Sequence, residues 1–293
     1  MPAPNFTLTQ DNYYTPQADQ IYMSVSQYKN FAGTPGKKGC EFAALEKIFN
    51  PVEEPSSTAL LVGSYVDSYF EGTLDAFKAE HPELFTKQGT LKADYRRAEN
   101  IINRINQDQL FTAFMSGKKQ EIMTVDDLFG SPWKIKMDSY FPGDKIVDLK
   151  IMASINEMKY VPGIGKMDFV RYWGYDTQGA VYQKIVEMNT GDKLPFYIAV
   201  ASKEETPDIQ IFHIGQEILD DALVKVEDRM PRIMAVKNGQ MEPKRCETCS
   251  LCRTSRVLTE PVELTDYFAD IFAQQTNTNG ITQVLDLSDM TID

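Results

Sequence analysis

Two aspartates and a lysine on consecutive strand-like segments could together hydrolyse a phosphodiester bond. Asp138 lies in an alternating run at 133–141, and Asp148 and Lys150 lie in an apolar run at 145–150 that follows a Pro-Gly-Asp turn. Residues two apart on a strand share a face, so all three side chains point to one side if the hairpin keeps its register. Carboxylate oxygens suit Mg²⁺ or Mn²⁺, which activates water, and a lysine can orient or deprotonate that water. The spacing therefore predicts a metal-dependent hydrolytic site.

An acid-x-lysine triplet is not specific by itself. The chain also contains Glu157-Met158-Lys159 and Glu242-Pro243-Lys244, and about two such triplets arise by chance in a chain of this length with average charged usage. Only Asp148 lies in an apolar strand that follows a hairpin partner with an acid of its own. The alternative for these residues is a solvated strand face, where acids and lysines usually lie.

Four cysteines form a second pattern with chemical meaning. Cys246, Cys249 and Cys252 are spaced C-x2-C-x2-C, and Cys40 lies 206 positions before Cys246. The chain has no signal peptide, so we expect it in the cytoplasm, where thiols stay reduced and disulfides are rare. Three close thiolates and a distant fourth could bind one Zn²⁺ or a [4Fe–4S] cluster, and ligand softness alone does not separate the two. The alternative is four unrelated buried thiols.

Composition and net charge indicate which classes of binding partner the protein can have. The 293 residues have globular proportions of hydrophobic and charged residues, and no apolar run reaches the length of a membrane span. The formal net charge is −12, but residues 257–293 hold seven acids and no base. A nucleic-acid partner is therefore not excluded, provided that a local basic groove binds it. The candidate groove residues, which are close in sequence to the acids, are Lys134, Lys136, Lys166 and Arg171.

The order of predicted elements indicates an α/β fold. Residues 20–116 are mainly helical, residues 118–214 form the sheet core, and residues 215–256 contain a helix and the cysteine run. Three strands in a meander, a helix, two more strands and a final helix predict a mixed central sheet of about five strands flanked by helices. We expect one domain over residues 1–256, followed by an acidic segment at 257–293 that is flexible from about residue 275.

A family resemblance covers nearly the whole chain to about residue 256. The run WKIKMDSYFPGDKIVDLK, followed by FVRYWGYDTQGAVYQKI, resembles the PD-(D/E)xK nuclease superfamily, specifically the phage and prophage exonucleases similar to the RecE (exodeoxyribonuclease VIII) nuclease domain. The resemblance implies a restriction-endonuclease-like core. It also implies that Asp138, Asp148 and the Leu149 backbone carbonyl bind the metal and that Lys150 activates water. The Q-x-x-x-Y motif of Gln178 and Tyr182, which share one helical face, would position the scissile phosphate.

Two further acids match the resemblance less closely. Glu121, on the first predicted strand, matches the position where many relatives have an extra acidic ligand; alone, it would be an ordinary exposed strand residue. The family's helical G-x-x-x-H motif appears here as Gly63 to Asp67, with aspartate in place of histidine. Asp67 could still bind Mg²⁺, which prefers oxygen ligands, or indicate a changed metal preference.

The cysteines also match relatives that contain iron–sulfur clusters. AddB-type nucleases and CRISPR spacer-acquisition nucleases resemble this arrangement, although their final cysteine is usually spaced further away than Cys252 is from Cys249. The resemblance implies a [4Fe–4S] cluster that fastens the C-terminal segment to the N-terminal helix, and the shorter spacing leaves Zn²⁺ as the alternative. Such a centre would stabilise the fold without touching the reaction.

These patterns favour a metal-dependent deoxyribonuclease, more an exonuclease than an endonuclease, in phage or prophage recombination or DNA-end processing. The expected partners are linear duplex or single-stranded DNA and, as a candidate, a single-strand annealing protein; no membrane is expected, and a homo-oligomer is suggested by ring-forming relatives. One alternative is a non-catalytic module that binds DNA ends or a recombinase partner on a nuclease fold. Another is a structural zinc or iron–sulfur protein without DNA chemistry.

Overall fold

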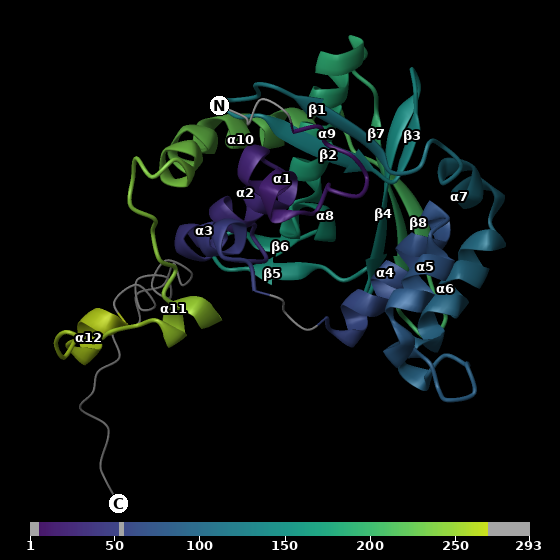
Figure 1. The fold of residues 1–293 in the computed structure, drawn as a ribbon, viewed down its shortest axis with the longest axis horizontal. Coiled ribbons are helices and arrows are strands. Elements are labelled where there is room, and N and C mark those ends of the chain that lie inside the picture. Colours follow the sequence, from purple (N-terminus) through teal and green to yellow (C-terminus); the bar gives the residue numbers. More distant parts are fainter. Residues whose placement is uncertain (1–5, 53–55, 269–293) are drawn as a thin grey trace, which may run out of the picture.

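A mixed sheet forms the centre of the protein (Figure 1). The computed structural model describes residues 6–52 and 56–268. The sheet has the order β3-β4-β7-β8, in which β4 and β7 are parallel and the outer pairs are antiparallel. Its strands are β3 (Ser139–Phe141), β4 (Lys145–Met152), β7 (Phe196–Ser202) and β8 (Ile209–His213). The predicted α/β class with a mixed sheet is therefore confirmed.

The remaining strands form two separate antiparallel pairs. β1 (Glu121–Val125) pairs with β2 (Trp133–Met137), and β5 (Lys159–Val161) pairs with β6 (Gly165–Met167), a pair that is not among the five predicted strands. All five predicted strands are present, but the predicted strand at 133–141 is interrupted at Asp138, between β2 and β3. The interruption separates the β1–β2 pair from the four-stranded sheet and leaves Asp138 at the junction.

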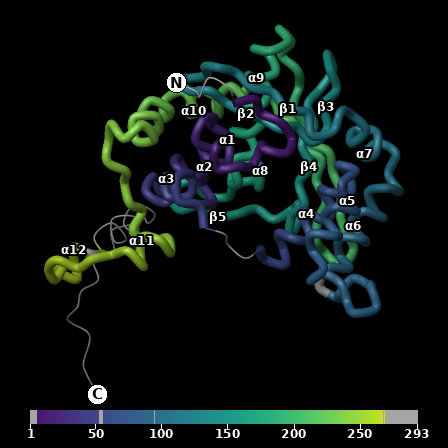
Figure 2. The backbone as a smooth tube through the Cα atoms, in the orientation of Figure 1, coloured from purple at the N-terminus to yellow at the C-terminus, as the bar shows by residue number. Residues whose placement is uncertain are grey.

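Helices cover both faces of the sheet (Figures 1 and 2). Successive side chains of β4 point to opposite faces, so each face forms a hydrophobic core with its own layer of helices. Ile146 joins the core under α2, α9 and α10, whereas Val147 and Leu149 join the core under α4 and α6. The helices of the first layer are α2 (Val25–Ala32), α9 (Tyr175–Thr190) and α10 (Gln216–Lys237). Those of the second layer are α4 (Thr58–Glu71), α5 (Leu74–Glu80), α6 (Arg96–Asn106) and α7 (Gln109–Phe114).

Left-handed glycines end two of the helices. Helix α4 ends where Gly72 takes a left-handed φ of 82° and donates its N–H to the Ser68 and Tyr69 carbonyls. Gly174, with φ of 66°, likewise separates α8 from α9. The other short helices are α1 (Pro16–Ile21), α3 (Glu41–Phe49), α8 (Phe169–Tyr172), α11 (Ser250–Thr254) and α12 (Leu264–Tyr267), with 3₁₀ turns at Pro82–Leu84 and Ala93–Tyr95.

The described segment after α10 returns to α3, where the Phe42 N–H donates to the Lys244 carbonyl. The extended segment after α10 and the short helix α11 lie next to α3 in both ribbon and tube views (Figures 1 and 2). The predicted flexible tail from about residue 275 falls outside the described residues. Of the helices in the described part of the chain, none combines the length and apolar character that a membrane crossing requires.

Candidate active site

The acid and lysine of β4 lie on one face of the sheet, as their spacing predicts. Asp148 is only 3% exposed, because β4 is an inner strand and α9 covers this face. Its Oδ2 lies 2.5 Å from Lys150 Nζ, and its Oδ1 accepts a 2.6 Å hydrogen bond from Gln178 Nε2 on α9. The carboxylate is thus held between a cation and an amide.

The break between β2 and β3 brings Asp138 to the same place. Its Oδ2 accepts a 2.8 Å hydrogen bond from the Leu149 N–H, at the edge of β4 that β3 no longer covers. The N–H and C=O of one strand residue face the same neighbour, so the Leu149 carbonyl also lies at this open edge. The structure therefore brings together Asp138, Asp148, Lys150 and the Leu149 backbone.

Helix α4 adds two acids from the other side of the sheet. Asp67 and Glu71 are four residues apart on one helical face, and both carboxylates act electrostatically on this cluster. Glu71 Oε1 accepts a 2.7 Å hydrogen bond from Gln120 Nε2, whereas Asp67 Oδ1 is buried and has no hydrogen-bond partner among the described residues. Glu71 was not predicted, although its i, i+4 spacing from Asp67 in the G-x-x-x-D helix was a usable signal.

The clustered charges change the proton affinities of the site. Burial, and then the Asp148 carboxylate, raise the pKa of Asp138 well above its usual range. Burial, together with the Glu71 and Asp148 charges, raises the pKa of Asp67 to about 7, although Lys150 opposes this shift. Burial disfavours the Lys150 ammonium, but Asp148 and Asp138 outweigh it and raise the Lys150 pKa. One lysine does not neutralise this group of carboxylates.

The donors present fit a divalent cation. Asp67, Asp138, Asp148 and the Leu149 carbonyl are hard oxygen donors of the kind that Mg²⁺ and Mn²⁺ prefer. The buried Asp67 Oδ1 without a partner and the raised pKa of Asp138 both indicate negative charge that a cation would compensate. These residues would hold the ion, and it would neutralise phosphoryl charge and lower the pKa of water.

Gln178 and Tyr182 both reach the site, but each side chain is already hydrogen-bonded to another residue of the protein. Gln178 holds Asp148, and the Tyr182 hydroxyl donates a 3.1 Å hydrogen bond to the Lys136 carbonyl of β2. Tyr182 is 9% exposed, and burial raises its pKa well above the usual range. In the structure, the predicted Q-x-x-x-Y pair therefore orients the strands that carry the carboxylates.

One predicted DNA contact is wrong. Lys134 was expected on a solvent-accessible basic face with Lys136, but it is 2% exposed. Its ammonium lies 2.7 Å from Asp19 Oδ1, also donates to the Tyr13 carbonyl, and is therefore engaged inside the protein. The physical reason is that the segment around α1, which the sequence predicted to be irregular, packs over β2 and covers this residue.

In the described part of the chain, no hydrogen bond or ion pair joins Glu121, Lys166 or Arg171 to these carboxylates. Glu121 is half-buried on β1, where its charge helps, after burial, to raise the pKa of Tyr140. The strongest charges on Asp138 come instead from β4 and α4. Lys166 is exposed on β6, and Arg171 is exposed and lies 3.5 Å from Asp168. Lys136, by contrast, lines a cavity next to Lys150.

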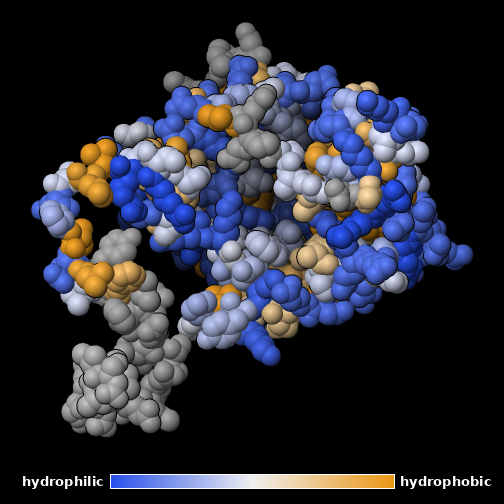
Figure 3. All heavy atoms as spheres, turned by 90° about the horizontal axis from the view of Figure 1, so that it is seen from below, coloured by the Kyte–Doolittle hydropathy of each residue, from blue (hydrophilic) through white to orange (hydrophobic). Residues whose placement is uncertain are grey.

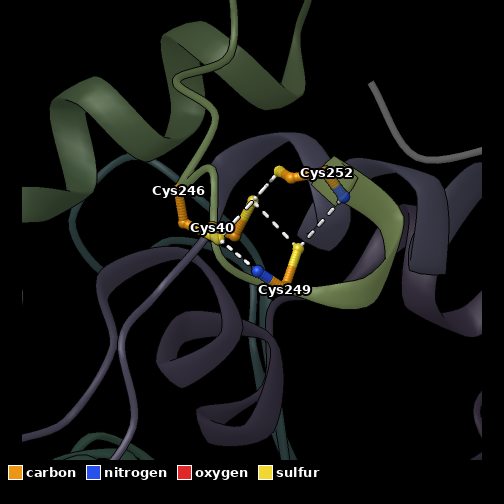
Figure 4. Close-up of side chains that lie close together, drawn as sticks. All are labelled: Cys40, Cys246, Cys249 and Cys252. Atoms are coloured by element: carbon orange, nitrogen blue, oxygen red, sulfur yellow. Dashed lines mark hydrogen bonds between the residues drawn. The ribbon is translucent and has the colours of Figure 1, made fainter. Parts of the chain in front are cut away.

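The four cysteines converge at a second centre (Figure 4). Cys40 caps the N-terminus of α3 and Cys249 that of α11, so two helix starts bring their thiols together. All four sulfurs lie within 4.8 Å of one another, with Cys40–Cys252, Cys246–Cys252 and Cys40–Cys249 separations of 3.6, 3.9 and 4.0 Å. The sequence prediction that these residues meet agrees with the structure.

The protein also supplies donors to these sulfurs. The Ala43, Cys249 and Cys252 amides donate to Cys40, Cys246 and Cys249, respectively, at 3.2–3.4 Å. Burial disfavours the Cys246 thiolate, but hydrogen bonds from Thr248 and Cys249 outweigh it and lower the Cys246 pKa to about 6. A tetrahedral ion with metal–sulfur bonds of about 2.3 Å separates its sulfurs by about 3.8 Å. The cysteine set therefore fits a single metal ion.

We predict that alanine substitutions at two helical glycines near the site change the stability of the fold in opposite directions. A Cβ at Gly63 in α4 would meet nothing within 4 Å, so Gly63→Ala should stabilise the fold by about 0.5–1 kcal/mol through helix propensity. A Cβ at Gly179 in α9 would lie 2.5 Å from the Phe196 ring, so Gly179→Ala should cost about 1–3 kcal/mol. Urea unfolding of both variants checks this, and shifts of the same sign would contradict it.

Comparison with known proteins places this geometry in a family. Residues 24–255 match the model of a PDDEXK-like domain of unknown function (DUF3799). A crystal structure described as "Putative exonuclease" from Eubacterium rectale is 58% identical, covers 90% of this chain and 99% of its own, and superposes with a TM-score of 0.86. A structure of SSO0001 is 11% identical over 76% of this chain and 95% of its own, with a TM-score of 0.30. No curated protein matches. The chain therefore belongs to the PDDEXK-like family DUF3799.

Proposed function

We propose that this protein is a metal-dependent deoxyribonuclease that hydrolyses DNA phosphodiester bonds, with exonuclease action on DNA ends in phage or prophage recombination. The single observation that carries the proposal is the convergence of Asp138, Asp148 and Lys150 at the open edge of β4. The name of the Eubacterium rectale relative supports an exonuclease. A single-strand annealing partner and a homo-oligomer remain predictions from the family resemblance.

Each residue has a role in this proposal. Asp138, Asp148, Asp67 and the Leu149 carbonyl bind Mg²⁺ or Mn²⁺, which supplies charge neutralisation and a more acidic water. Gln178 fixes the orientation of Asp148 through its 2.6 Å hydrogen bond. The Lys150 ammonium, held by Asp148, donates to the phosphate or to the attacking oxygen. Glu71 adds negative charge behind Asp67 and makes the site more attractive to a cation.

The aspartate that replaces the family histidine does not argue for an inactive binding module. Asp67 lies with the other acids and has a carboxylate oxygen available, so it extends the oxygen donor set. For the cysteines, we propose one structural Zn²⁺ in place of the [4Fe–4S] cluster that the resemblance implies. An iron–sulfur cube gives each thiolate its own iron and so spaces the sulfurs further apart than a shared ion does.

The function is tested with linear duplex DNA labelled at the 5′ or the 3′ end, incubated with Mg²⁺ or Mn²⁺. We expect release of short labelled products from one end, none in EDTA, and no attack on a covalently closed circle. Intact linear DNA with both ions would contradict the nuclease assignment. Equal cleavage of the closed circle would contradict the exonuclease assignment and leave an endonuclease.

A further inference from the structure

A cavity of about 370 Å³ extends from Lys150 and Gln178, which both contact the Asp148 carboxylate, toward the N-terminal helices. Lys150, Gln178 and Tyr182 line one end, and residues of α2 and α3, including Lys47, line the other. Seen from below, the molecule is hollowed between the part built on α1–α3 and the part built on α4–α7, and hydrophilic residues border the hollow (Figure 3). The cavity volume is in the range of about 300–1,000 Å³ typical of pockets for small ligands. A space of this size suits unpaired nucleotides.

The charge of the cavity is opposite to that of the chain. The protein carries a formal net charge of −12, yet Lys29, Lys47 and Lys136 all line this one space. Among the described residues of the lining, the acid is Asp19, and its carboxylate is paired with the buried Lys134 at 2.7 Å. A concentration of ammonium groups in an acidic protein favours a polyanion at this place.

An exposed aromatic ring, that of Tyr14, also lines this cavity. Tyr14 is 73% exposed, and its ring packs edge-to-face on Tyr13 at 4.9 Å. Lys136 Nζ lies 4.3 Å from the centre of the Tyr14 ring. Partial burial, and then the Glu71 and Asp138 charges, raise the pKa of Tyr14 to about 12, so these carboxylates act electrostatically on the phenol. An exposed ring flanked by a lysine is a typical stacking platform for a nucleobase.

Two buried lysines hold the segment that carries Tyr14 in place through contacts with Asp19. Lys134 Nζ bonds to the Asp19 side chain, and Lys237 Nζ on α10 donates to the Asp19 carbonyl at 3.0 Å. The Met23 backbone also pairs with β2, since the Lys134 N–H donates to the Met23 carbonyl at 2.9 Å. Tyr14 is therefore presented by an ordered segment, which lowers the entropic cost of binding.

We infer that this cavity binds unpaired nucleotides of the DNA strand beside the scissile phosphate. The Tyr14 ring stacks on a base, and the ammonium groups of Lys29, Lys47 and Lys136 contact backbone phosphates. The inference rests on the proposed function and names its substrate form: a single strand, or an end that has separated from its complement. Tyr14 then favours an unpaired base of any sequence, which offers its π-face for stacking, while the carboxylates act on the phosphate.

The test measures binding without turnover. In EDTA, Tyr14→Ala should raise the dissociation constant of a fluorescein-labelled single strand of about 12 nucleotides by about 5- to 100-fold, because one stacked base is lost. Tyr14→Phe should bind like the wild type. Lys47→Gln should weaken binding moderately and reduce the salt slope by about 0.7, the value for one single-strand phosphate contact.

A matched control separates stacking from damage to the fold. Tyr160→Ala removes another exposed tyrosine, 65% exposed on β5 and outside the cavity, and should leave binding unchanged. A strand of abasic residues should bind Tyr14→Ala and wild type equally. Equal affinity of Tyr14→Ala and wild type for the normal strand, or an equal loss on both strands, would overturn the inference. A wild type that binds through Tyr14 but cleaves nothing would instead contradict the proposed function.

Discussion

Asp148→Asn should lower the rate of DNA cleavage by about a thousandfold or more. The substitution keeps the shape of the side chain but removes the charge that lies 2.5 Å from Lys150 and faces the proposed metal. Loss of about 4 kcal/mol of transition-state stabilisation gives this factor, at 1.36 kcal/mol for each tenfold change in rate. The measurement is single-turnover release of labelled nucleotides in Mg²⁺, together with Mn²⁺ affinity by calorimetry, which should also fall.

The fold should survive this substitution. Removing the Asp148 charge weakens the pairing of Lys150 but also relieves repulsion on Asp138 and Asp67, and Asp138 still attracts the ammonium. These effects offset one another, so we expect a melting temperature near that of the wild type. Full cleavage by Asp148→Asn would remove the basis of the proposed mechanism.

Glu121→Gln is the matched control. It removes a half-buried carboxylate from the neighbouring hairpin, whose charge helps, after burial, to raise the pKa of Tyr140. It should cleave like the wild type, whereas Asp67→Asn should lose Mn²⁺ affinity. The reverse result would mean that Glu121, the family's expected ligand, completes the metal site.

The central residues of the site could be predicted because local patterns determine them. Strand alternation places Asp148 and Lys150 on one face, and the hairpin brings Asp138 within reach. The reason why Asp138 reaches the site differs from the prediction. The strand was expected to continue through Asp138 in register with β4, but it is interrupted there, and a hydrogen bond from the Leu149 N–H holds the carboxylate. The four cysteines could likewise be grouped from spacing, because three of them lie within one short segment.

The errors concern contacts between distant parts of the chain. Lys134 and Lys136 are two apart on β2, so alternation predicts similar exposure, but the segment around α1 buries Lys134 and leaves Lys136 partly exposed. Tyr14 approaches the acids from a segment far away in the sequence, and neither strand nor helix periodicity contains that information. Which surface is covered, and which side chain enters a cavity, depends on packing between elements that only the structure gives.

Cys252→Ser should destabilise the protein by several kcal/mol. Cys252 is fully buried and lies 3.6 Å from Cys40, 212 positions away, so the centre closes most of the chain into one loop. By analogy with a cross-link closing a loop of this size, the entropic contribution is about 5 kcal/mol. At about 2–4 °C for each kcal/mol, the melting temperature should fall by about 10 °C or more, and calorimetry of the purified variant measures this.

Measurements of metal content and of proteolysis show whether the lower stability of Cys252→Ser comes from loss of a metal at the four-cysteine centre. The wild type should contain one zinc per chain and no iron, whereas iron with a brown colour would show a [4Fe–4S] cluster. Because Lys244 and Arg253 flank the cysteines, trypsin should cut Cys252→Ser there first. Ser250→Ala, an exposed change on the same helix, should keep metal and stability. A metal-free wild type, or a Cys252→Ser variant as stable as the wild type, would mean that ordinary packing and not a metal joins α3 to α11.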